Sequence, residues 1–135
     1  MLGEQIGELK GKLVGQRVLP PDNGAPRMEI SFQQAGKLLG IEVTNTLTVV
    51  NTARPGGVMY AEGHGIIMSK DGEVVLGAPV GILKLGPGGM GGSVRGVVFF
   101  QTQSAKFARL NSLVALIEVE QDANWNAQVK LWEWK

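Results

Sequence analysis

The only histidine of the chain lies two residues from a carboxylate, and this pair is the first candidate for chemistry. Glu62 and His64 alternate with smaller residues in the segment 58–69. On a strand, both side chains point the same way, with Cα atoms about 6–7 Å apart. Each group changes the proton affinity of the other, so we take Glu62 and His64 as candidate catalytic acid and base. The alternatives are a purely structural pair and a strand face that points outward.

Four further polar side chains interrupt or border apolar strand faces and are candidate ligand-binding residues: Tyr60, Asn45, Arg95 and Asn111. A buried amide without partners costs about 1–3 kcal/mol, so Asn45 either orients a ligand carbonyl or bonds to another side chain. Arg95 would hold an anion if it pointed into an apolar interior, and is ordinary if it points outward. Asn111 ends an apolar stripe, and the Tyr60 hydroxyl is a possible hydrogen-bond donor.

Other sources of reactivity are missing or incomplete. The chain has no cysteine, and one histidine among scattered carboxylates is a poor match for a metal site, so we expect neither a metal nor another cofactor. The glycine-rich segment 86–92 lacks the Lys-Ser/Thr pair of a phosphate-binding loop. We interpret it as a flexible turn, with a mobile lid as the alternative.

These residues lie on segments that alternate with a period of two, which is typical of β-strands. In 41–49, isoleucine, valine, asparagine and leucine occupy one face, and glutamate and threonines occupy the other. Turn residues such as the Asp-Gly pair at 71–72 separate the segments. We predict eight strands, at 4–19, 26–35, 39–51, 58–69, 73–85, 93–103, 108–121 and 125–134.

Short connections between successive strands predict an all-β domain, an eight-stranded antiparallel up-and-down barrel that spans residues 1–135. A two-sheet sandwich is the structural alternative. Two segments, 33–39 and 104–111, could instead form helical turns. The 20 glycines are scattered through apolar segments, where glycine marks bulges and sharp bends of strands.

Composition narrows the classes of partner. A net charge of +1 gives no basic stripe for nucleic acid, and no apolar run approaches the roughly 20 residues of a membrane span. With no signal peptide pattern either, we expect a soluble cytoplasmic protein. Apolar residues on both faces of the segments 73–85, 93–103 and 125–134 predict a homo-oligomer, either dimer or trimer. Trp132 and Trp134 share one of these faces and suggest a subunit contact.

Three sequence blocks resemble a family of uncharacterised prokaryotic proteins with the allene oxide cyclase-like barrel, a relative of dirigent and calycin-type barrels. The blocks are Ala-Glu-Gly-His-Gly-Ile at 61–66 with Asp-Gly-Glu at 71–73, Leu-Asn-Ser-Leu at 110–113, and Leu-Trp-Glu-Trp-Lys at 131–135. Allene oxide cyclases bind an unsaturated fatty-acid epoxide in the barrel and steer its cyclisation. The resemblance implies a barrel with a lumen and an oligomeric assembly, and it assigns no functional residue.

From these observations we expect a barrel that binds a small, largely apolar molecule and isomerises or cyclises it without a cofactor. Residues such as Ile41, Val43, Leu47 and Val49 would line the lumen, and the polar candidates above would orient the ligand. Whether the protein is an enzyme is left open by the sequence. The alternative is a non-catalytic binding or assembly module whose barrel is filled by its own side chains.

Overall fold

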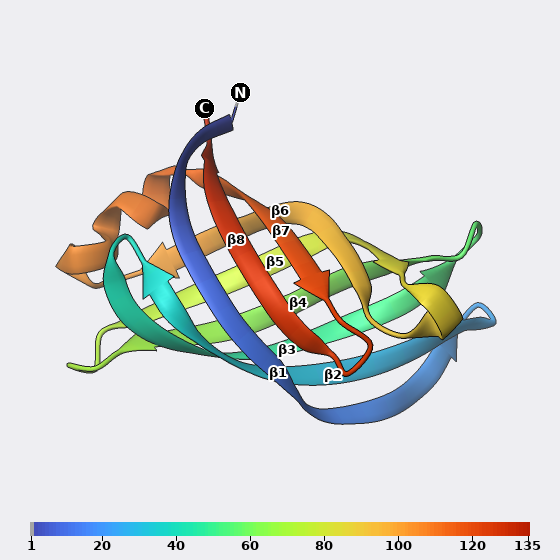
Figure 1. The fold of residues 1–135 in the computed structure, drawn as a ribbon. Coiled ribbons are helices and arrows are strands. Elements are labelled where there is room, and N and C mark those ends of the chain that lie inside the picture. Colours follow the sequence, from blue (N-terminus) through green and yellow to red (C-terminus); the bar gives the residue numbers. More distant parts are fainter. Residues whose placement is uncertain (1) are drawn as a thin grey trace.

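A computed structural model describes residues 2–135 and shows a closed barrel of eight antiparallel strands (Figure 1). Each strand pairs with its neighbours in sequence, and β1 also pairs with β8, which closes the barrel. The predicted up-and-down barrel is therefore confirmed, and the sandwich alternative is excluded. The strands are β1 (Leu2–Asp22), β2 (Ala25–Leu38), β3 (Ile41–Arg54), β4 (Val58–Ser69), β5 (Val74–Leu85), β6 (Gly92–Thr102), β7 (Val114–Gln121) and β8 (Asn126–Trp134).

Two short 3-10 helices complete the chain: η1 (Pro87–Gly89) and η2 (Ala105–Ser112). Neither of them is long and apolar enough to cross a membrane. The helical turn considered at 104–111 exists as η2, and the strand predicted from residue 108 begins only at Val114. Phe107 and Leu110 explain this, because three-residue spacing places both on one side of a 3-10 helix, and both are fully buried. The helical turn considered at 33–39 is wrong, because β2 continues to Leu38 in register with β1 and β3.

The two ends of the barrel differ. At one end, η2 and the connections β2–β3 and β4–β5 surround a compact apolar cluster that includes Phe107, Leu110, Leu38 and Val75. We call this the closed end. The opposite end carries η1 and the connections β1–β2, β3–β4 and β7–β8, and no residue of these connections belongs to the apolar cluster. We call this the open end.

Glycine allows β5 and β6 to approach closely. A Cβ atom on Gly96 would lie 2.1 Å from the carbonyl oxygen of Val80, and one on Gly81 would lie 2.6 Å from that of Arg95. Gly81 and Gly96 are directly opposite each other in the ladder. Side chains at these two positions would force the strands apart, so the pair of glycines fixes the local curvature of the barrel wall.

The two faces of β4 show which side of the wall is inside. Ala61, Gly63, Gly65 and Ile67 are buried, whereas the residues between them are exposed. In β3 the buried face includes Val43, Asn45 and Asn51. Strand alternation therefore determines the orientation of every candidate site residue on these strands.

Candidate functional site

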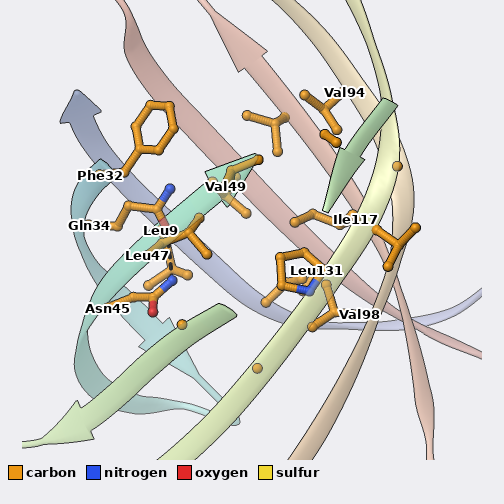
Figure 2. Close-up of a pocket in the computed structure, with 18 of the residues that line it drawn as sticks. Leu9, Phe32, Gln34, Asn45, Leu47, Val49, Val94, Val98, Ile117 and Leu131 are labelled. Carbon is orange, nitrogen blue, oxygen red and sulfur yellow. Dashed lines mark hydrogen bonds between the residues drawn. The ribbon is translucent and has the colours of Figure 1, made fainter. Parts of the chain in front are cut away.

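The barrel interior contains a cavity of about 100 Å³, shown in part in Figure 2. Residues from all eight strands line it, and Trp125 and Gln121 extend the lining toward the open end. The predicted lining residues Leu47 and Val49 are confirmed, and Val43 and Ile41 belong to the apolar packing nearer the closed end. Most of the lining is apolar: Leu9, Ile30, Phe32, Leu47, Val49, Ala61, Ile67, Pro79, Val80, Leu83, Val94, Val98, Phe100, Ile117, Val119, Val129 and Leu131.

Two amide side chains, Gln34 and Asn45, form a hydrogen-bonded pair on the cavity wall. The Asn45 Nδ2 atom donates to Gln34 Oε1 at 3.0 Å, and both residues are more than nine-tenths buried (Figure 2). Asn45 Oδ1 has no hydrogen-bond partner. Gly65 leaves the space for this oxygen, because a Cβ atom there would lie only 2.6 Å from it. Asn45 thus lies on the lumen wall as expected, and its role in binding stays a prediction.

Asn51 and Gln121 carry two further amides on the cavity wall, toward the open end. Asn51 is six residues from Asn45 along β3, so the two amides are roughly 20 Å apart on one strand face. Asn51 Oδ1 and Gln121 Oε1 are buried and have no partner. Sequence reasoning overlooked both residues together with Gln34. The signal for Asn51 was available, since it continues the alternation of Asn45, Leu47 and Val49.

Glu62, His64 and Tyr60 do not reach the lumen, and the expectation that they line it is wrong. Glu62 and His64 are exposed on the outer face of β4, whose inner face carries the small residues that fit the narrow interior. Tyr60 shares this outer face, and the Arg54 guanidinium lies 4.3 Å from the centre of its ring. This is a cation–π contact on the surface of the barrel.

Arg95 and Asn111 also lie outside the lumen, contrary to the expected convergence of polar groups. Arg95 is exposed, and its Nη2 atom forms an ion pair with Glu120 Oε1 at 2.7 Å. Asn111 belongs to η2 and bonds twice to the backbone of Thr102, accepting from its N–H at 2.8 Å and donating to its carbonyl at 2.9 Å. Asn111 therefore fastens η2 to the end of β6.

Titratable groups are confined to other parts of the molecule. The cavity lining contains no Asp, Glu, His, Lys, Arg or Tyr, and residues 2–135 contain no cluster of three side chains suited to a metal. The strongest electrostatic perturbation is at the closed end, where Asp71 bonds to Lys106 of η2 and accepts from Ser69 Oγ at 2.8 Å. Lys106 first, and Ser69 second, lower the pKa of Asp71 from 3.8 to about 2.

The glycine-rich segment 86–92 forms a compact turn at the open end. Gly86 N–H donates to the Gly91 carbonyl at 3.2 Å, and Gly89 N–H donates to the Gly86 carbonyl at 3.0 Å. These bonds, with η1 between them, agree with the interpretation of this segment as a turn. Its position beside Gln121, which pairs with Gly92, places it at the rim of the lumen.

Comparison with known proteins reveals the fold alone. No protein-family profile and no curated protein sequence matches the chain. Three solved structures superpose over nearly the whole chain. A protein of unknown function from Clostridium acetobutylicum has a TM-score of 0.82 at 13% identity, with 98% of each chain covered.

The second structure, a conserved protein of unknown function from Rhodopseudomonas palustris, has a TM-score of 0.83 at 16% identity and covers 98% of this chain and 97% of its own. The third, a β-barrel-like protein from Acinetobacter baumannii, has a TM-score of 0.80 at 12% identity and covers 100% of this chain and 96% of its own. The chain therefore shares a β-barrel fold with uncharacterised bacterial proteins.

Proposed function

We propose that this protein is a binding protein whose barrel holds a small, neutral, largely apolar molecule that carries one hydrogen-bonding oxygen. The observation that carries the proposal is the buried Gln34–Asn45 amide pair in an otherwise apolar wall. Ligand pockets are commonly apolar with a few polar groups that fix the orientation of the ligand. The amide pair supplies such groups. We also propose that the chain belongs to the allene oxide cyclase-like family, as its sequence resemblance implies.

The charge of the ligand follows from the lining. A charged group that enters the cavity would lose its water and find no opposite charge, because the lining contains no ionisable side chain. Even after relaxation such a transfer costs several kcal/mol per ion. A neutral ligand avoids this cost.

The size of the ligand follows from the cavity volume. Pockets for drug-sized molecules are about 300–1,000 Å³, and an engineered apolar cavity of about 150 Å³ binds benzene. The cavity here is about 100 Å³. It fits a molecule of a few carbon atoms, and a longer ligand would have to extend toward the open end.

A hydroxyl group fits the amides best. An amide offers both N–H donors and a carbonyl acceptor, and a hydroxyl both donates and accepts. Asn45 Oδ1 is a buried hydrogen-bond acceptor without a donor, whereas buried polar groups are nearly always paired. A short aliphatic alcohol is therefore the probe of choice.

The proposal does not extend to isomerisation or cyclisation. Proton transfer requires an acid or base within hydrogen-bond reach of the ligand, directly or through one water molecule. Glu62 and His64, the candidates for that role, lie on the outer face of β4. The groups that line the cavity can orient a ligand, but none of them titrates near neutral pH.

The test is a titration followed by NMR on the side-chain NH₂ signals of Gln34 and Asn45. We expect 1-butanol to shift these signals saturably, with a dissociation constant in the millimolar range. This corresponds to a binding free energy of about −4 kcal/mol. Butylammonium and butanoate should not produce the saturable shift. Absence of a saturable shift with 1-butanol at these signals contradicts the proposal.

A pair of Gly→Val variants provides the control. Gly77 lines the cavity, and a Cβ atom there would have no neighbour closer than 3.8 Å, so Gly77→Val adds bulk to the lumen. Gly15 of β1 does not line the cavity, and a Cβ atom there would have no neighbour within 4 Å. Binding should be lost in Gly77→Val and kept in Gly15→Val.

The second candidate function is an assembly module with a filled barrel, and the modest cavity volume of about 100 Å³ favours it. It predicts that the protein associates with itself while 1-butanol gives no saturable shift. The 1-butanol titration separates the two candidates, because self-association is compatible with both of them.

A further inference from the structure

The outer face of β5 is apolar from Val74 to Ile82. Its outward residues there are Val74, Leu76, Ala78, Val80 and Ile82, and the next outward residue, Lys84, is exposed at the end of the strand. The inner face of the same strand also packs in the barrel, where Val75 and Leu83 are buried. A strand that is apolar on both faces is typical of a sheet covered on both sides.

Neighbouring strands widen this apolar surface. Ile66 lies opposite Leu76, Met68 lies opposite Val74, and Phe99 lies opposite Ala78 in the ladders of β4, β5 and β6. The larger of these side chains are exposed: Ile66 51%, Met68 44%, Val74 39%, Leu76 46% and Phe99 53%.

A second line of apolar residues crosses β5 at Val80. In successive ladders Val80 pairs with Val97, Val97 with Leu116, and Leu116 with Trp132. All four are partly exposed on the outer wall. We call the outward residues 66, 68, 74, 76, 78, 80, 97, 99 and 116 the apolar face.

The area of the apolar face is in the range of apolar patches that are often functional. If a large apolar side chain presents about 150–200 Å² when free, five of them exposed by about half expose on the order of 400 Å². The largest apolar patch of a typical monomer is about 300–600 Å² and is often an interaction site. A stable interface buries about 800 Å² per partner, which the partly exposed members of the face and its polar border can supply.

We propose that the apolar face is an isologous dimer interface, in which β5 of one protomer packs across β5 of a second copy. A two-fold axis brings the residues beside it against their own copies, so a charge there would meet a like charge. Between Val74 and Ile82 the outer face of β5 has none, and Ala78, the middle residue of this column, is small enough to lie at the axis.

The border of the apolar face argues against a lipid surface as the occupant. Membrane-surface binding relies on clusters of Lys and Arg beside the apolar residues. Here the nearest groups on β4 are Glu62 and His64, and the nearest cation on β6, Arg95, is paired with Glu120. Lys84, at the end of the β5 column, is a single cation and not a cluster. Face-to-face packing of two such sheets about 10 Å apart is the ordinary arrangement of β-sandwiches.

Sedimentation equilibrium of the full chain at micromolar concentration tests the proposal. We expect twice the chain mass of 14.4 kDa. Leu76→Lys places a charge in the contact on both protomers and should raise the dissociation constant roughly a hundredfold or more, as loss of a central contact does. The matched control is Val18→Lys, an apolar residue 76% exposed on β1, which should leave the mass unchanged.

Mixing two charge variants tests the two-fold geometry. Ala78→Lys and Ala78→Glu should each be monomeric alone, with unchanged circular dichroism, and should form a heterodimer when mixed. A monomeric wild type, a trimer, a dimer that persists in Leu76→Lys, or a mixture that stays monomeric overturns the proposal. None of these outcomes depends on whether the lumen binds a ligand.

Discussion

Replacement of the buried amide pair should separate stability from binding. The relevant variants are Gln34→Met and the double variant Gln34→Met/Asn45→Leu, both close to the original side chains in volume. Each keeps the cavity lined and changes only its hydrogen-bonding groups. We predict that the double variant is more stable than wild type and that Gln34→Met is less stable.

The magnitudes follow from the partners in the structure. In wild type, Asn45 Nδ2 has one partner and Asn45 Oδ1 has none. Gln34→Met leaves the whole Asn45 amide unpaired, at a cost of about 1–3 kcal/mol. The double variant removes the unpaired oxygen and loses only one hydrogen bond with a net value of about 1 kcal/mol. It should therefore be more stable than wild type by about 1–3 kcal/mol, because apolar groups are also buried.

Urea denaturation followed by circular dichroism measures these differences. A change of 1 kcal/mol in unfolding free energy corresponds to roughly 3–5 °C in melting temperature for a domain of this size. The double variant should be the most stable protein and Gln34→Met the least. If the amides are retained for binding, the double variant should also lose the saturable shift that 1-butanol causes in the methyl signals of Leu47 and Val49, two lining residues that it keeps.

Two outcomes would refute this reasoning. If Gln34→Met is as stable as wild type, the Asn45 amide does not depend on Gln34 in the folded protein. If the double variant is less stable than Gln34→Met, the amides stabilise the barrel, and their presence gives no argument for a ligand.

Three further predictions concern the wall and the closed end of the barrel. Gly96→Ala should destabilise the fold by about 1–3 kcal/mol, because the new methyl would lie 2.1 Å from the Val80 carbonyl oxygen. In Gly77→Ala the new methyl would have no neighbour closer than 3.8 Å, so this variant should leave the fold unchanged in stability or stabilise it by up to about 1 kcal/mol. Equal melting temperatures for Gly96→Ala and Gly77→Ala would contradict both expectations. The pKa of Asp71 is lowered from 3.8 to about 2, so its bonds stabilise the fold above pH 3.8 and this stabilisation is lost as pH falls toward 2. Asp71→Asn should have a flatter decline of unfolding free energy between pH 4 and 2 than wild type, and parallel curves would show that the interaction with Lys106 contributes nothing.

Most of the fold was accessible from the sequence because it rests on local signals. Alternation in 41–49 and the turn residues around 58–69 define β3 and β4, and β4 has the predicted bounds. The segment 104–111 was ambiguous, since its residues are acceptable in a strand or a helical turn. Its outcome depends on burial of Phe107 and Leu110 against the closed end, which is a tertiary contact that no local pattern contains.

The candidate site was predicted only in part. Asn45 lies on the lumen wall because its face also carries Leu47 and Val49, while the opposite face carries threonines. Gln34 was missed because its role comes from the ladder between β2 and β3, where it lies opposite Asn45. Such cross-strand partners depend on register, and register is not visible in either strand alone.

The register of the β3–β4 hairpin nevertheless contained the information that excludes Glu62 and His64. The turn pairs Arg54 with Val58, and from there odd residues of β3 face odd residues of β4, so that Leu47 lies opposite Gly65. Directly opposed residues lie on the same face of the sheet. Once Asn45 and Leu47 face inward, even-numbered residues of β4 must face outward.

The same rule continues around the wall. Odd residues of β4 pair with odd residues of β5, as in Ala61 with Gly81, and Gly81 pairs with Gly96 of β6. Even residues of β6 therefore face inward and Arg95 faces outward. A lumen that contained Asn45, His64 and Arg95 together is incompatible with these turns. One inward residue and the lengths of the connections therefore suffice to assign the faces of β3 to β6, because none of these ladders contains a bulge.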